Sequence, residues 1–329
     1  MRIVKVNKDS IANILSDLLK RSPTNYGDFQ DKVDAIIKNV RDNGDKAVFD
    51  YTAQFDKAEI NADNILVTEE EIKEAYEEVD DELIKVIRKA IKNIRDFHEK
   101  QIQKSWFETR EDGVMLGQKV TPMETCGVYV PGGKAVYPSS VLMNIVPAHV
   151  AGVKNIIMTT PPGKDGKVTA NTLVAAKEAG ATKVYKVGGA QAIAAMAFGT
   201  ESIPKVDKIV GPGNIFVALA KKAVYGNVSI DSIAGPSEIL VLADETANPR
   251  YVAADLLSQA EHDEMASAIL VTTSEELAHK VSDEIDGFLN QLSRVVSGKY
   301  DVFLASDDFI DVTTLTQMDY MIMDSEEMR

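Results

Sequence analysis

The sequence predicts an α/β protein with two Rossmann-like parallel-sheet units and a helical N-terminal region. From about residue 120, short apolar runs that end in glycine or proline alternate with Ala-rich helical segments, which is the pattern of strands separated by crossover helices. The runs are mostly continuous and β-branched, as expected for strands buried on both faces of a parallel sheet. Before residue 100 the apolar residues instead recur at helical spacing.

Length and composition limit the classes of function. The 329 residues suffice for about two domains, and their 45% hydrophobic content can fill the cores. The net charge of -15 argues against nucleic-acid or anionic-membrane partners and favours small-molecule chemistry. One cysteine excludes an intramolecular disulfide framework. The sequence shows neither a secretory signal nor an apolar run of roughly 18 residues, so we expect a cytoplasmic protein.

We expect four regions along the chain. Residues 1–119 form a mainly helical N-terminal region, with an apolar stripe from Ile84 to Ile94 and a capping box made by Thr68 and Glu71. Residues 120–235 form a first α/β unit that resembles nucleotide-binding units. Residues 236–294 begin a second α/β unit, and residues 295–329 form a divergent acidic tail with one candidate strand, 300–305.

The strand candidates identify where a ligand would bind. A doubly wound sheet binds ligands just beyond the carboxyl ends of its strands. The strand candidates are "GVYV", "NIIMTT", "KVYKVG" and "KIVG" in the first unit, and "EILVLA" and "AILVTT" in the second. The glycine-containing loops "PGG", "GGAQ" and "GPGN" follow three of the strands in the first unit.

Each of these loops has an ordinary structural explanation as well as a functional one. Tyr129 could be a strand aromatic packed on a helix, Gln191 a solvated side chain and Asn214 a helix N-cap. Singly, these explanations are favoured. Three such loops at one sheet edge favour a nucleotide-type ligand, because glycines let the backbone approach it and helix N-termini offer free N–H groups.

The second unit contains a candidate metal site in "DLLSQAEHDE". Gln259 and His262 are three residues apart on a predicted helix and share a face. By itself this spacing is more typical of a solvated pair. Ser237, in the Gly-Pro turn of "DSIAGPSEIL", could contact a substrate or merely complete the turn. Cys126 is interpreted as inert, because "METCGVYV" supplies no base or cation to activate its thiol.

Taken together, several segments resemble histidinol dehydrogenases. They are "TCGVYVPGGKAVYPSSVLMN", "KVGGAQAIAAMAFGT", "KIVGPGN", "AGPSE" and "LLSQAEHD", in family order and spacing, and the resemblance runs from near the N-terminus to about Arg294. It implies a zinc-dependent, homodimeric enzyme of histidine biosynthesis. Such an enzyme oxidises L-histidinol through histidinal to L-histidine with two NAD.

The resemblance also implies roles for individual residues. Tyr129, Gln191 and Asn214 would contact NAD. Ser237, Gln259 and His262 would contact the substrate, and Gln259 and His262 would also be zinc ligands. Zinc accepts imidazole nitrogen and carbonyl oxygen and would act mainly as a template and Lewis acid.

One part of the family pattern is absent from the sequence. The family's Glu-His acid/base pair, in a "PEHLE"-like motif, has no counterpart here, and no histidine follows Arg294 to complete the zinc shell. The catalytic pair is therefore unassigned, and we expect impaired activity. The alternative is a catalytically inactive nucleotide-binding or subunit-pairing protein. An unrelated zinc hydrolase is disfavoured, because no H-E-x-x-H motif is present.

Overall fold

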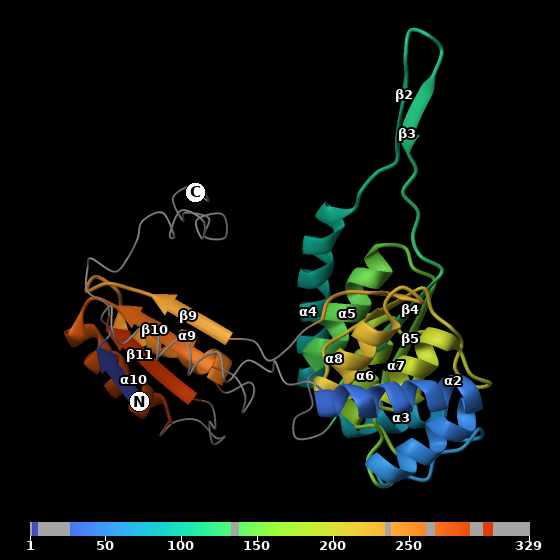
Figure 1. Cartoon of the computed structure of the whole chain (residues 1–329), viewed down its shortest axis with the longest axis horizontal. Helices are drawn as coiled ribbons and strands as arrows, with labels where there is room; N and C mark the ends of the chain where they lie inside the picture. The colour runs from blue at the N-terminus through green and yellow to red at the C-terminus, as the bar shows by residue number, and fades with distance from the viewer. Residues whose placement is uncertain are drawn as a thin grey trace. The chain divides into compact units, whose positions relative to one another are not determined.

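The computed structural model describes residues 2–5, 27–132, 138–233, 238–260, 267–289 and 299–304. The chain forms two compact units: a central unit, Asn25–Gly235, and a terminal unit that combines Met1–Thr24 with Pro236–Arg329. Each unit is built on one parallel sheet with helices (Figure 1). This confirms the predicted α/β class.

The central sheet has the strand order β6-β5-β4-β7-β8, and all neighbours are parallel. The order runs outward in both directions from β4, so the switch point at which such sheets bind ligands lies beside β4. The predicted strands are confirmed, and "NIIMTT" coincides with β5; β8 was not predicted. The strands are β4 Thr125–Tyr129, β5 Asn155–Thr160, β6 Lys183–Lys186, β7 Lys208–Val210 and β8 Ser229–Ile230.

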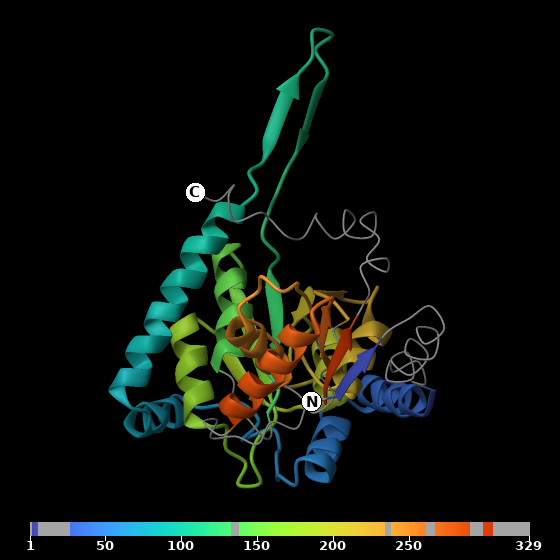
Figure 2. The same ribbon diagram turned by 90° about the vertical axis from the view of Figure 1, so that its left-hand side faces the viewer.

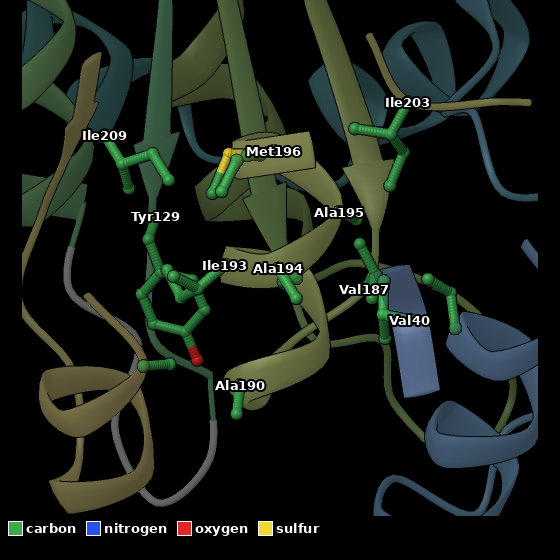
Figure 3. Close-up of a cluster of buried hydrophobic side chains, with 14 of the residues drawn as sticks. Val40, Tyr129, Val187, Ala190, Ile193, Ala194, Ala195, Met196, Ile203 and Ile209 are labelled. Carbon is green, nitrogen blue, oxygen red and sulfur yellow. The ribbon is translucent and has the colours of Figure 1, made fainter. Parts of the chain in front are cut away.

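Helices cover both faces of the central sheet. One buried cluster joins the sheet to α3, α4, α5 and α6, and another joins it to α2, α7 and α8 (Figures 1 and 3). The capping box of Thr68 and Glu71 opens α3 as predicted, and Ile84 and Ile87 of the predicted stripe are buried. The helices are α2 Gly27–Phe55, α3 Glu69–Glu78, α4 Asp81–His98, α5 Pro138–Val150, α6 Ala170–Ala179, α7 Gly189–Phe198 and α8 Ile215–Val224.

The region expected to be mainly helical also contains strands. A two-stranded antiparallel hairpin, β2 Trp106–Thr109 with β3 Met115–Gln118, follows α4 and the 3-10 turn Glu99–Gln101. It projects from the central unit (Figure 2). All eight of its strand residues are exposed, so it lacks the alternation of buried and polar residues that predicts a strand.

The terminal unit has the parallel strand order β1-β11-β10-β9. Its strands are β1 Arg2–Lys5, β9 Glu238–Leu242, β10 Ser267–Thr272 and β11 Lys299–Leu304, and its helices are α9 Pro249–Ala260 and α10 Glu275–Leu289. The candidate strand in the tail is thus confirmed as β11. It lies between two other strands, so the sheet extends beyond residue 294. Among the helices described, none is both long and apolar enough to cross a membrane.

Candidate functional site

A cavity of about 630 Å³ opens at the carboxyl ends of the central strands. It lies where the sequence predicted a ligand, because residues from the ends of β4 and β5 and from the starts of α7 and α8 all line it. Tyr129, Gln191 and Asn214, which come from three separate loops, line this one cavity. The lining also includes Asp56, from the segment after α2, and Gly189, at the start of α7.

Tyr129 is the last residue of β4 and is 3% exposed. Its ring packs beside Ile193, with the hydroxyl directed towards the first turn of α7 (Figure 3). There the hydroxyl oxygen accepts a hydrogen bond of 3.2 Å from the backbone N–H of Gly189. Burial raises the pKa of Tyr129 to about 12. Tyr129 is therefore a neutral phenol at the base of the cavity.

Gln191 lies in the first turn of α7 and is 1% exposed. It is not the solvated side chain that sequence alone would suggest. Its amide nitrogen and oxygen are both buried and have no hydrogen-bond partner. A buried, unpaired amide destabilises the fold by about 1 to 3 kcal/mol per group. The Gln191 side chain therefore has a donor and an acceptor that no protein group uses.

Asn214 is the N-cap of α8, where its side-chain oxygen accepts hydrogen bonds from the N–H groups of Phe216 and Val217. The structural explanation is thus correct for the oxygen. The same side chain lines the cavity, so Asn214 combines capping with an exposed position at the site.

Two charged residues hold the Gly211 turn that leads to Asn214. Lys221 of α8 is 2% exposed; its ammonium pairs with Asp231 and donates a hydrogen bond of 2.8 Å to the carbonyl of Gly211. The N–H of Gly211 donates a hydrogen bond of 2.8 Å to Asp231. The sequence analysis did not identify Lys221. Its signal was a lysine on the apolar face that Val217 and Val224 mark at helical spacing.

The glycines of the site loops permit close backbone contact. Gly211 has φ 116°, and a Cβ there would lie 2.0 Å from the carbonyl oxygen of Tyr129. Gly189 has φ 64°, and a Cβ there would lie 2.6 Å from the Gln191 side-chain oxygen. Both φ values favour glycine, and at Gly211 an added Cβ would also collide with the backbone of Tyr129.

Asp56 is a second residue that the sequence analysis missed. It follows α2 directly and lines the cavity. One of its carboxylate oxygens is buried without a hydrogen-bond partner, and burial raises the pKa of the carboxyl to about 6. Nothing in "YTAQFDKAEI" indicates this position, since only the packing of α2 on α7 brings the end of α2 to the sheet edge.

Of the predicted substrate and zinc residues, the structure describes only Gln259. Ser237 and His262 lie outside the described residues. Gln259 lies on α9, whose Leu256 and Leu257 are buried in the core, and its amide nitrogen is buried without a partner. Within the described ranges, no group of three or more His, Cys, Asp or Glu side chains could hold a metal ion.

Cys126 is buried in β4, and burial raises the pKa of its thiol to about 11. A thiol with so high a pKa carries almost no thiolate near neutral pH. The structure therefore supports the interpretation that Cys126 is inert.

Comparisons with known proteins agree with the motifs. The sequence profile of the histidinol dehydrogenase family matches residues 19–318, which extends past the last motif. The histidinol dehydrogenase of Bacillus subtilis (strain 168) is 59% identical over 292 residues, which cover 88% of this chain and 67% of that protein. The enzyme of Halalkalibacterium halodurans is 56% identical over 295 residues, which cover 89% and 68% of the two chains.

A solved structure gives the same result. The crystal structure of histidinol dehydrogenase from Elizabethkingia anophelis matches with a TM-score of 0.82 and 39% identity, over 92% of this chain and 71% of that one. The chain thus spans about two thirds of the length of the first two curated relatives, at 67% and 68%. On sequence and fold together, the chain belongs to the histidinol dehydrogenase family, and with it to the oxidoreductases that act on histidinol.

Proposed function

We propose that this chain binds NAD in the cavity of the central unit and uses it to oxidise L-histidinol through histidinal to L-histidine. One observation supports this most directly: Tyr129, Gln191 and Asn214, which the family resemblance assigns to NAD, line one cavity beside the switch point of the sheet. Bound NAD would supply the hydride acceptor, one molecule for each of the two oxidations.

The residues of the cavity suit a dinucleotide. The Gln191 amide offers an unused donor and acceptor in a dry position, as a carboxamide or ribose would require. Gly189 lines the cavity, so its backbone can approach a bound ligand closely. The chain's own contribution is therefore to bind and orient the cofactor, because hydride transfer needs donor and acceptor carbons in near contact.

We also propose that Gln259 and His262 bind zinc and, with Ser237, the substrate. The amide nitrogen of Gln259 is buried without a hydrogen-bond partner, which supports a substrate acceptor there; zinc would bind the amide oxygen. Two protein ligands are fewer than the three or four that zinc sites ordinarily use. We expect this chain to bind zinc weakly.

Turnover by this chain should be low. The 329 residues contain no "PEHLE"-like motif, and loss of a general acid or base commonly costs a factor of about 10² to 10⁴. Calorimetry with NAD and with histidinol, each with and without zinc, and a spectroscopic NADH assay test the proposal. We expect NAD binding with almost no NADH formed. Absence of NAD binding would contradict the proposal, whereas NAD binding without any histidinol binding would favour the inactive nucleotide-binding alternative.

We further propose that the chain forms a homodimer in the cytoplasm. The hairpin β2–β3 exposes Trp106, Phe107, Met115 and Leu116, each at least half exposed, and a lone two-stranded hairpin is marginally stable in water. A second copy would cover these side chains. Sedimentation should show a dimer that W106S/F107S weakens, and a monomer at micromolar concentration would contradict the proposal.

The cysteine content supports the proposed cytoplasmic location, because a single free cysteine suits a reducing compartment.

A further inference from the structure

The carboxylate of Asp56 is an unexplained charge in the cavity. It is the only acidic side chain among the described residues that line the cavity. One of its oxygens is buried and accepts no hydrogen bond, and a buried acceptor left unpaired destabilises the fold. A group kept at such a cost is more easily explained by a ligand than by stability.

The chemistry of a dinucleotide limits what a carboxylate can contact. The two phosphates would be repelled by its charge. The groups that can donate hydrogen bonds to it are the ribose hydroxyls and the amino groups. A ribose diol presents two neighbouring donors, which match the two oxygens of one carboxylate.

The position of Asp56 selects between the two riboses. The segment after α2 runs near the turn that follows β5: a Cβ added at Gly166 would lie 3.9 Å from Ile60, and Lys57 lines a neighbouring hollow together with Lys164. Dinucleotide-binding units hold the adenosine ribose near the end of the second strand, commonly with an acidic residue. In the central unit β5 is that second strand. The turn after it places Lys164 and Lys167 in the cavity, but no carboxylate.

We propose that Asp56 binds the hydroxyls of the adenosine ribose of NAD and excludes dinucleotides that carry a 2′-phosphate. The proposal rests on the proposed binding of NAD in this cavity. The acidic residue that ordinarily follows the second strand would here be supplied by the end of α2. A 2′-phosphate would place up to two negative charges against the carboxylate, although Lys164 and Lys167, which also line the cavity, would attract it.

Titration calorimetry of the 329-residue chain with NAD and with NADP tests the proposal. The wild type should bind NAD much more tightly than NADP. Asp56→Asn should weaken NAD binding by about ten- to a hundredfold, as expected for loss of hydrogen bonds to a charged group, and should bring the two affinities close together. Asp56→Ala should have the same effect and guards against an effect specific to the asparagine.

Asp63→Asn provides the matched control. Asp63 is exposed and does not line the cavity. Its replacement by asparagine removes one negative charge, as Asp56→Asn does. It should leave both affinities unchanged. Thermal melting should show that all three variants are folded.

The remaining outcomes separate the proposals. If Asp56→Asn and Asp56→Ala bind NAD and NADP as the wild type does, the role of Asp56 is refuted while the NAD site stands. Equal weakening of both ligands would refute selection at the 2′ position. Failure of the wild type to bind either dinucleotide would refute the NAD site itself, and with it the role of Asp56.

Discussion

Lys221 and Asp231 form an ion pair directly beneath the Gly211 turn, and both also bond to the backbone of Gly211. The pair ties the turn after β7 and the second half of α8 to the segment after β8. It thereby fixes the loop that carries Asn214 at the edge of the cavity.

Replacement of Asp231 by alanine should lower stability by about 3 kcal/mol, because it leaves the ammonium of Lys221 buried and unpaired. Lys221→Met should cost less, because Asp231 is partly exposed and water can solvate it. Urea unfolding followed by circular dichroism measures both. Lys222→Met is the control, since Lys222 is exposed on the same helix. If Lys221→Met and Lys222→Met lower the free energy of unfolding equally, the ion pair does not stabilise the fold.

Gly211→Ala should destabilise the fold and abolish dinucleotide binding. Its φ of 116° and the 2.0 Å approach of a Cβ to the Tyr129 carbonyl both require the strand end or the turn to shift. Gly113→Ala is the control: its φ is 81°, but nothing lies within 4 Å of the added atom. Gly113→Ala should lower the free energy of unfolding by only about 1 to 2 kcal/mol, which is the cost of a left-handed backbone for alanine. If the two variants melt alike, close packing at Gly211 is unimportant.

Gln191→Leu should leave stability unchanged or raise it, and should weaken NAD binding strongly. The leucine removes two buried polar atoms that have no partner, whose burial costs about 1 to 3 kcal/mol each. Differential scanning calorimetry and NAD titration on the same sample measure both effects. A marked loss of stability would mean that the amide has a structural partner instead of a ligand.

Asp56→Asn should stabilise the protein above pH 6 and lose this advantage in acid. Burial raises the pKa of Asp56 from 3.8 to about 6, so the native state binds a proton more readily than the unfolded chain does. Between these two values the wild type therefore loses stability as pH rises, and above pH 6 the full penalty is present. The asparagine variant carries no such charge. Unfolding free energies at pH 4 and pH 8 should diverge accordingly, and identical pH profiles would contradict the raised pKa.

The sequence by itself determined most strands of the two parallel sheets, though not β1 or β8, and the loops that follow β4, β6 and β7. Continuous β-branched runs such as "NIIMTT" and glycine turns such as "GPGN" act over a few residues, so their structure can be predicted locally. The motifs in their order and spacing also determined the family. Asn214 is an example: neighbouring residues predict its capping role, and its position after a strand predicts its place at the ligand-binding edge of the sheet.

The tertiary structure decided the contacts made across long stretches of sequence. The pairing of Arg2–Lys5 with Lys299–Leu304 and the position of Asp56 at the cavity depend on packing between distant segments. Gln191 shows the same effect in burial, because a glutamine in a first helical turn is ordinarily solvated and becomes dry only when other elements cover it. Such features depend on the free energy of the complete tertiary structure. A short stretch of sequence therefore cannot predict them.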